Sequence, residues 1–248
     1  MISMITSIQN KQVKEWKKLH KKKYRYEKRQ FLIEGFHLIE EAYETDQAVE
    51  TIIVDEETDC PDWFDDDYVV RVTKQVFSEL SQTETPQGIL AVLRMQDVQA
   101  VKSNYVLLLD AIQDPGNLGT IIRTADAAGF SQVVLGDGTV DLYNDKVIRA
   151  TQGSLFHIPI IQANLQEAIH QLKESGFSIW ATTLKRAQNY RDIEASPKTA
   201  IILGNEGSGV AENHIDLADE LVKIPIFGQA ESLNVGIAAG ILMYYIRN

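Results

Sequence analysis

Residues 224–240 read IPIFGQAESLNVGIAAG, a short apolar strand that breaks at Gly228 and continues through polar residues into a helix. The alanines and glycines of that helix permit close packing against a neighbour. Ser232 and Asn234 stand just before it, so the turn points backbone donors and two neutral polar side chains into one pocket. The pattern predicts a binding site where a strand meets a helix.

Length and composition allow one large domain or two modest ones with real cores, and we expect two, because the chain has 248 residues and is 44% hydrophobic. Cys60 is the only cysteine in the sequence. The chain therefore cannot form an internal disulfide, nor a zinc site of four cysteines or of two cysteines and two histidines. The five histidines lack metal-ligand spacing, so we expect no bound metal.

No segment predicts a membrane span or a secretory signal. The longest apolar run near the C-terminus, residues 235–246, is well short of the roughly 20 residues that a helix needs to cross a bilayer. The N-terminus lacks a charged region followed by an apolar core and a cleavage site. We therefore expect a cytoplasmic protein without a membrane partner.

Charge is distributed unevenly along the chain. The net charge is -11, yet residues 1–29 hold ten lysines and arginines against two glutamates, so this segment carries +8 and the remainder -19. Trp16, Tyr24 and Tyr26 are interleaved with the basic residues. Such a basic arm suits phosphate binding and stacking on exposed bases, but lysine-rich ends also serve as plain solvated surface. The sequence leaves both interpretations open.

The chain divides into a basic arm (1–29), a small α/β unit (30–95), a polar linker (96–104) and a larger domain (105–248). In the larger domain, short apolar runs alternate with helical segments, which predicts a parallel sheet covered on both faces. The runs are residues 105–109, 132–135, 156–161, 177–181 and 199–203. Helices are expected at 118–128, 142–150, 165–175, 211–217 and 234–246. Ligands of such a sheet bind outside the carboxyl ends of its strands, so the loops after Leu109, Leu203 and Ile226 matter most.

The first of these loops leads into a helix that carries an arginine among apolar residues. Pro115 and Gly116 force a turn, Asn117 is a good helix N-cap, and Arg123 follows within two helical turns. The alternative is that Arg123 only pairs with Asp126 or a neighbouring helix.

The second loop, residues 203–210, reads LGNEGSGV and follows an apolar strand. Its three glycines let the backbone approach a ligand closely, while Glu206 projects from the turn. The loop lacks the lysine of a P-loop and the spacing of the dinucleotide fingerprint. A plain strand-to-helix turn remains the alternative.

Taken together and in this order, the three loops resemble the SpoU family of the SPOUT class, which are RNA ribose 2′-O-methyltransferases that use S-adenosylmethionine. The resemblance rests on residues 117–129, 202–207, 224–225 and 232–235. Residues 33–35 and 85–88 are similar to the family's N-terminal substrate-binding domain. The likeness covers the chain from about residue 31 to its end.

The resemblance implies an α/β fold whose C-terminal parallel sheet contains a trefoil knot, preceded by a smaller α/β substrate-binding domain. It also implies a homodimer and an RNA substrate, either ribosomal RNA or transfer RNA. The expected cofactor-binding residues are Thr182, Leu203, Gly204, Ile224 and Leu233. The expected catalytic residues are Asn117, Arg123, Glu206, Ser232 and Asn234.

The family likeness implicates Arg123 in activation of the ribose hydroxyl. Because an arginine stays protonated, we expect Arg123 to clamp the adjacent phosphate and to stabilise negative charge that develops on the oxygen. We also expect Asn117 to align Arg123 or the ribose, and Ser232 and Asn234 to orient the acceptor nucleotide. Glu206 anchors these groups or accepts a proton.

The sequence leaves two other classes of protein open. One is a catalytically silent RNA-binding or ribosome-associated protein with the same fold, against which the intact set of polar residues argues. The other is a Rossmann-type enzyme that acts on a small molecule, which the missing fingerprint disfavours. No Gly-x-Ser-x-Gly elbow supports hydrolase chemistry.

Overall fold

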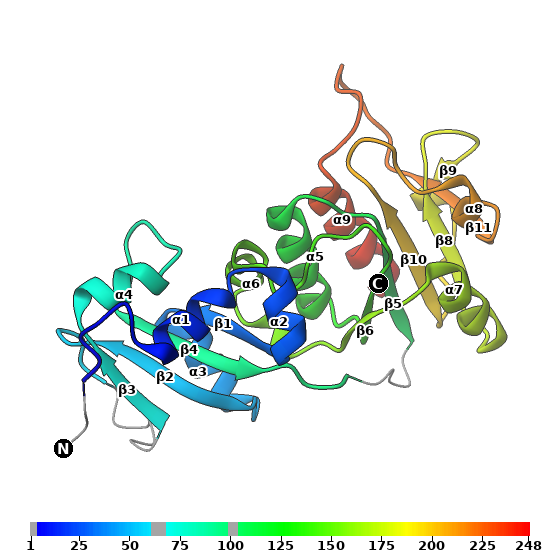
Figure 1. Cartoon of the computed structure of the whole chain (residues 1–248). Helices are drawn as coiled ribbons and strands as arrows, with labels where there is room; N and C mark the ends of the chain where they lie inside the picture. Colours follow the sequence, from blue (N-terminus) through cyan, green and yellow to red (C-terminus); the bar gives the residue numbers. More distant parts are fainter. Residues whose placement is uncertain (1–3, 61–67, 99–103) are drawn as a thin grey trace. The chain divides into compact units, whose positions relative to one another are not determined.

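A computed structural model describes residues 4–60, 68–98 and 104–248 (Figure 1). The chain forms two compact units, one built from the chain up to Asp97 with Asp141–Phe156, the other from Val98–Val140 with His157–Asn248. The α/β class with a parallel sheet is confirmed. Most of the expected linker, residues 99–103, lies outside the described residues.

The first unit contains a four-stranded sheet in the order β1-β4-β2-β3. Its strands are β1 (Gln30–Glu34), β2 (Val49–Asp55), β3 (Val69–Val72) and β4 (Ile89–Arg94). Its helices are α1 (Lys11–Lys18), α2 (Lys22–Lys28), α3 (Phe36–Glu44), α4 (Lys74–Leu80) and α6 (Asp145–Thr151), with a 3-10 turn η2 (Ser154–Phe156). Strand β4 is antiparallel to β1 and β2, whereas β2 and β3 are parallel.

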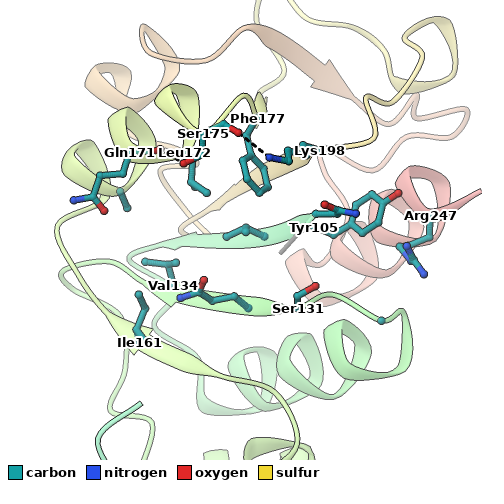
Figure 2. Close-up of a pocket in the computed structure, with 15 residues that line it drawn as sticks. Tyr105, Ser131, Val134, Ile161, Gln171, Leu172, Ser175, Phe177, Lys198 and Arg247 are labelled. Carbon is teal, nitrogen blue, oxygen red and sulfur yellow. Dashed lines mark hydrogen bonds between the residues drawn. The ribbon is translucent and has the colours of Figure 1, made fainter. Parts of the chain in front are cut away.

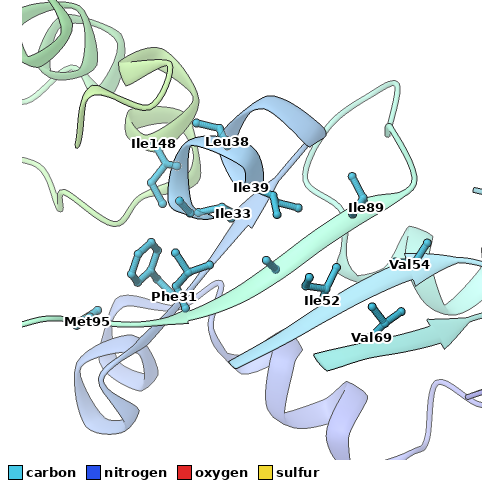
Figure 3. Close-up of a cluster of buried hydrophobic side chains, with 13 residues drawn as sticks. Phe31, Ile33, Leu38, Ile39, Ile52, Val54, Val69, Ile89, Met95 and Ile148 are labelled. Carbon is cyan, nitrogen blue, oxygen red and sulfur yellow. The ribbon is translucent and has the colours of Figure 1, made fainter. Parts of the chain in front are cut away.

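Both faces of this sheet are covered, because side chains of β4 alternate between two buried clusters. Ile89, Ala91 and Leu93 pack with α3 and with Ile148 of α6 (Figure 3). Leu90 and Val92 belong to the opposite cluster, which α1 and α4 cover. A strand that is buried on both faces needs apolar residues at successive positions, as β4 has from Ile89 to Leu93.

The basic segment is not a separate arm, which corrects the expected division at residue 29. Val13, Trp16 and Leu19 are buried in the cluster on the α1 side of the sheet. Their spacing of three residues places them on one face of α1 and its C-cap, while the lysines point outward. The net charge of residues 1–29 does not reveal this apolar stripe. Residues 141–156 were likewise expected in the larger domain but cluster with the first unit.

A buried ion pair fixes the segment 141–156 within the first unit. The side chains of Arg25 and Asp141 are only 6% and 7% exposed, and Arg25 Nη2 contacts Asp141 Oδ2. Arg25 Nη1 donates to the Leu19 carbonyl at 2.8 Å, and the Tyr26 hydroxyl donates to Asp141 Oδ1 at 2.8 Å. Burial and this hydrogen bond raise the pKa of Tyr26. The Asp141 carboxylate thus holds α2 through two neighbouring residues.

The second unit contains a seven-stranded sheet in the order β7-β6-β5-β10-β8-β11-β9, with every pairing parallel. Its strands are β5 (Tyr105–Asp110), β6 (Gln132–Leu135), β7 (Ile160–Gln162), β8 (Ser178–Thr182), β9 (Gln188–Asn189), β10 (Thr199–Gly204) and β11 (Glu220–Lys223). Its helices are α5 (Pro115–Ala127), α7 (Leu165–Glu174), α8 (Glu212–Ile215) and α9 (Val235–Arg247), with a 3-10 turn η3 (Tyr190–Asp192). The central strands β5 and β10 are almost wholly buried.

The structure corrects two local predictions in this unit. The expected strand at residues 224–227 is absent, because β11 ends at Lys223 and the chain runs without regular structure to Asn234. The N-cap of α5 is Asp114, not Asn117. Pro115 favours the first helical position, which places the cap one residue before it. Asn117 therefore lies inside the first turn, and its side chain is free for other contacts.

We predict that Asp141→Ala lowers the free energy of unfolding by about 3 kcal/mol or more, because it leaves the buried Arg25 guanidinium without a countercharge. Urea unfolding followed by circular dichroism measures the loss. The matched control is Asp97→Ala, since Asp97 forms an ion pair with Arg29 but its side chain is 89% exposed. The free energy of unfolding of Asp97→Ala falls by at most about 1 kcal/mol. Equal losses in both variants would contradict the assignment.

Candidate active site

The loop after β5 is fixed by its own backbone and by the loop after β10. Ala111 adopts a left-handed backbone with φ of 56°, and Asn205 Nδ2 donates to its carbonyl at 2.9 Å. Asp114 then caps α5 by accepting from the Asn117 backbone N–H at 2.8 Å. The first turn of α5 is therefore in place before any ligand arrives.

The loop after β10 is folded around the side chain of Asn205. Asn205 Oδ1 accepts from the backbone N–H groups of Gly207 and Ser208 at 2.9 and 3.0 Å. This turn projects Glu206 toward the start of α5. Gly204 is required here, because a Cβ at this position would lie 2.1 Å from the backbone of Gly209 and Val210.

Glu206 joins the two loops through its carboxylate. It accepts from the backbone N–H groups of Gln113 and Asp114, both at 3.1 Å, and from Asn117 Nδ2 at 3.0 Å. Burial raises the pKa of Glu206, but the hydrogen bonds from Asn117 and the backbone outweigh this effect and lower the pKa below its ordinary value. Glu206 therefore accepts these hydrogen bonds as a carboxylate at neutral pH, which favours the anchoring role over that of a proton acceptor.

The third loop reaches the same point through Asn234. Its Oδ1 caps α9 by accepting from the backbone N–H groups of Gly236 and Ile237 at 2.9 and 3.3 Å. Its Nδ2 donates to Asn117 Oδ1 at 2.9 Å. The structure thus brings Glu206, Asn117 and Asn234 into one continuous hydrogen-bonded chain. The close packing of α9 on α5 that this requires is visible at Gly236, where a Cβ would lie 3.4 Å from the methyl group of Thr120.

Arg123 and Ser232 are not part of this hydrogen-bonded chain. Both are exposed, and neither side chain has a hydrogen-bond or ion-pair partner among the residues that the structure describes. Arg123 does not pair with Asp126, whose carboxylate instead contacts His157 at 3.1 Å. The guanidinium of Arg123 is therefore available to a ligand.

A cavity of about 570 Å³ opens beside these loops. Its volume lies within the range typical of small-molecule sites. All five residues expected to bind the cofactor line it: Thr182, Leu203, Gly204, Ile224 and Leu233. Glu206, Ser232 and Asn234 also line it. Their role in binding stays a prediction, but the structure gathers them around one space.

The lining of the cavity suits a ligand with an apolar ring and polar groups. Leu203, Ile224, Ile226 and Leu233 supply apolar surface. In the described structure, the backbone of residues 224–233 makes no hydrogen bond to another backbone group. Its N–H and C=O groups at the cavity can therefore pair with a bound molecule.

The sequence analysis did not identify the residues that join the Glu206 loop to the end of β5. Asp110 Oδ2 accepts from the Ala211 backbone N–H at 2.8 Å and lies 2.9 Å from His214 Nδ1. Together with the bond from Asn205 to Ala111, this contact fixes both ends of the Glu206 loop to the end of β5. The one available signal was an acidic residue at the end of an apolar strand.

The chain is similar to proteins of known family along nearly its whole length. The model of the SpoU rRNA Methylase family matches residues 104–244, and that of the MRM3-like substrate binding domain matches residues 10–91. The 23S rRNA (guanosine(2553)-2′-O)-methyltransferase RlmP of Bacillus subtilis is 46% identical, over 99% of this chain and 100% of its own length. The chain belongs to the SpoU rRNA methylase family.

Solved structures similar to this chain are also methyltransferases of this kind. The AdoMet-bound rRNA methyltransferase from Sinorhizobium meliloti has a TM-score of 0.88 and 32% identity, and the match covers 99% of this chain and 97% of that one. The SpoU methyltransferase AviRb from Streptomyces viridochromogenes, in complex with AdoMet, has a TM-score of 0.84 and 25% identity. That second match covers 96% of this chain and 97% of that one.

No group of three or more histidine, cysteine, aspartate or glutamate side chains among the described residues has a geometry that holds a metal ion. Within the same ranges, no helix is both long and apolar enough to span a bilayer.

We predict a pH-dependent effect of Glu206→Gln on stability. Because the pKa of Glu206 is lowered by folding, its charge stabilises the fold above the ordinary pKa of 4.5, and this contribution is lost as the pH falls through the lowered value. The difference in unfolding free energy between the wild type and the variant is therefore constant at neutral pH and closes below about pH 4.5. Urea unfolding at a series of pH values measures it.

The matched control is Glu174→Gln, at an exposed residue of α7 with no hydrogen bond or ion pair in the described structure. Its difference from the wild type stays near zero at every pH. A Glu206→Gln difference that persists unchanged to about pH 3 contradicts the anchoring role.

Proposed function

We propose that the chain methylates ribosomal RNA at a ribose 2′-hydroxyl with S-adenosyl-L-methionine as methyl donor, and that the residues gathered at the rim of the cavity carry the reaction. The enzyme class follows from the family: the protein is an RNA 2′-O-methyltransferase. The observation that carries the residue assignment is the bonded chain Glu206–Asn117–Asn234 beside a cavity of suitable size. A substrate inside the cell implies a cytoplasmic protein.

S-adenosyl-L-methionine fits the residues that line the cavity. When bound, it supplies an electrophilic methyl group on a sulfonium centre. Leu203, Ile224 and Leu233 offer apolar surface to its adenine, and the free backbone groups of residues 224–233 offer hydrogen bonds to the ring edge. Gly204 lets residues 209 and 210 pack directly against it in the wall of the cavity, and Thr182 also lines the cavity and donates to the Ile202 carbonyl at 3.1 Å.

The reaction needs the ribose oxygen held in line and its developing negative charge stabilised. Arg123 is exposed on α5 and has unused donors, so it clamps the neighbouring phosphate and stabilises that oxygen. Asn117 is held at both ends of its amide by Glu206 and Asn234, which aligns the first turn of α5 with the acceptor nucleotide. Ser232, at the rim and without a partner in the described structure, orients the same nucleotide.

We also propose that the C-terminal part of the chain is knotted. The segment after β11 leaves the sheet at Lys223, lines the cavity beside the loop after β10, and then packs α9 against α5 and β10. A chain that returns between two earlier loops in this way is compatible with the trefoil knot that the family likeness implies. The high similarity to SpoU structures supports it.

A homodimer is proposed on the exposed apolar face of α9. Ile237 and Tyr244 share one face of this helix and are 57% and 52% exposed, and Phe227 in the preceding loop is 93% exposed. Exposed large apolar side chains of this kind are typical of an interface. Arg123 stands on the adjoining helix α5, so a second copy bound here would place the active site at the interface.

The first unit is proposed to bind the RNA. Its lysines on α1 and α2 are mostly exposed, and they suit the phosphate backbone. The two short motifs of this unit organise one loop: Glu34 accepts from the hydroxyl of Ser81 at 2.7 Å, and Gln87 Oε1 accepts from the Phe36 backbone N–H at 3.0 Å. A preformed loop beside a basic surface is suited to structured RNA.

We predict that Arg123→Ala lowers kcat by about 100-fold, since it removes a donor to the developing charge, whereas affinity for S-adenosyl-L-homocysteine changes less than twofold. Tritiated methyl incorporation into ribosomal RNA measures the first quantity and calorimetry the second. Arg186→Ala, at a solvent-facing residue between β8 and β9, is the control and keeps wild-type values. Wild-type turnover in Arg123→Ala would refute the catalytic assignment. No incorporation by the wild type would favour the catalytically silent alternative.

The dimer is tested by Ile237→Asp, which places a charge on the apolar face of α9. Sedimentation equilibrium should show a dimer for the wild type and a monomer for the variant, because burying an unpaired carboxylate opposes association. Tyr68→Asp, at a 45% exposed residue of the first unit, serves as control and stays dimeric. A monomeric wild type refutes the proposal.

A further inference from the structure

The second unit contains another cavity, of about 910 Å³, at the edge of the sheet opposite the active site (Figure 2). Tyr105 and Gln132, the first residues of β5 and β6, line it, whereas the active-site loops follow the carboxyl ends of β5 and β10. In the view of Figure 2, Tyr105 and Arg247 lie at its right and Gln171 and Ile161 at its left. No step of the methyl transfer uses this cavity.

One polar side chain at this cavity is buried without a partner. Gln132 is 5% exposed, and its Nε2 forms no hydrogen bond in the described structure. An amide donor that is removed from water and left unpaired destabilises the fold. The position therefore carries a cost in stability that a hydrogen-bond acceptor on a bound molecule would remove.

The charges at this cavity have one sign. Lys198 and Arg247 are the ionised side chains among its described lining residues, and no carboxylate is among them, although the chain as a whole carries -11. Lys198 Nζ donates to the Ser175 carbonyl at 2.9 Å, which leaves two of its three donors unused. Arg247 Nε donates to the Ala128 carbonyl at 2.9 Å, and its guanidinium stacks 4.5 Å from the Tyr105 ring. Its terminal nitrogens remain available.

The rest of the lining is apolar, with Val134, Ile161, Leu172 and Phe177. A bare inorganic anion would leave this surface wet, whereas a purely apolar molecule would leave the donors unpaired. We propose that the cavity binds a small organic anion, whose polar groups pair with donors among Lys198, Arg247 and Gln132 and whose apolar body covers these side chains.

The test uses the full-length protein saturated with S-adenosyl-L-homocysteine, so that the active-site cavity is occupied, and the fluorescent aromatic sulfonate 8-anilinonaphthalene-1-sulfonate as probe. Fluorescence titration should give saturable binding to the wild type. Lys198→Glu and Gln132→Met should each raise the Kd at least about tenfold, because each removes a donor to the anion. Lys146→Glu, the same charge change at an exposed residue of the first unit, should leave the Kd unchanged.

Stability separates a ligand-binding role of Gln132 from a structural one. Gln132→Met keeps the shape of the side chain and removes the unpaired amide, so it should raise the Tm of the ligand-free protein while it weakens probe binding. Displacement of the probe by octanoate assigns a carboxylate as ligand, and displacement by adenosine 5′-monophosphate assigns a phosphate ester. Absence of saturable binding to the wild type, or equal affinity in all three variants, overturns the proposal. A lowered Tm of Gln132→Met also overturns it.

Discussion

The carboxylate of Glu206 is the group on which the candidate active site depends. Two backbone N–H groups from the start of α5 and the side chain of Asn117 all converge on it. Without this acceptor, three donors at the start of α5 would lose their shared partner. Because Asn117 also binds Asn234, the position of α9 depends on the same carboxylate.

The parallel sheet makes this convergence possible. Strands β5 and β10 are direct neighbours in register, and their carboxyl ends bring Asp110 beside Gly204. Asp110 and Asn205 then tie the two following loops together beneath Glu206. The site is thus supported by a rigid element below and by hydrogen bonds above, so little needs to move when a ligand binds. Arg123 and Ser232 differ, since they are exposed and free to follow the substrate.

Much of this arrangement could be predicted from the sequence, for definite reasons. The apolar runs of β5 and β10 are unbroken, which indicates strands buried on both faces, and parallel strands place their following loops at one edge. The prediction of Asn117 as the N-cap of α5 was wrong, although Pro115 favours the first helical position and so indicates Asp114 as the cap. The apolar residues 224–227 mimic a strand, yet Pro225 cannot donate to a ladder. The pairing of Asp110 with His214 joins distant parts of the chain, so the sequence around either residue does not predict it.

The hydrogen bond between Asn117 and Asn234 affects when the site can form as the chain is synthesised and folds. Its partners are 117 residues apart, and the second one stands at the start of α9, which follows every strand of the sheet along the chain. During synthesis the sheet can begin to assemble from its early strands before α9 has left the ribosome. The working site therefore forms only once α9 has been made and has packed against α5.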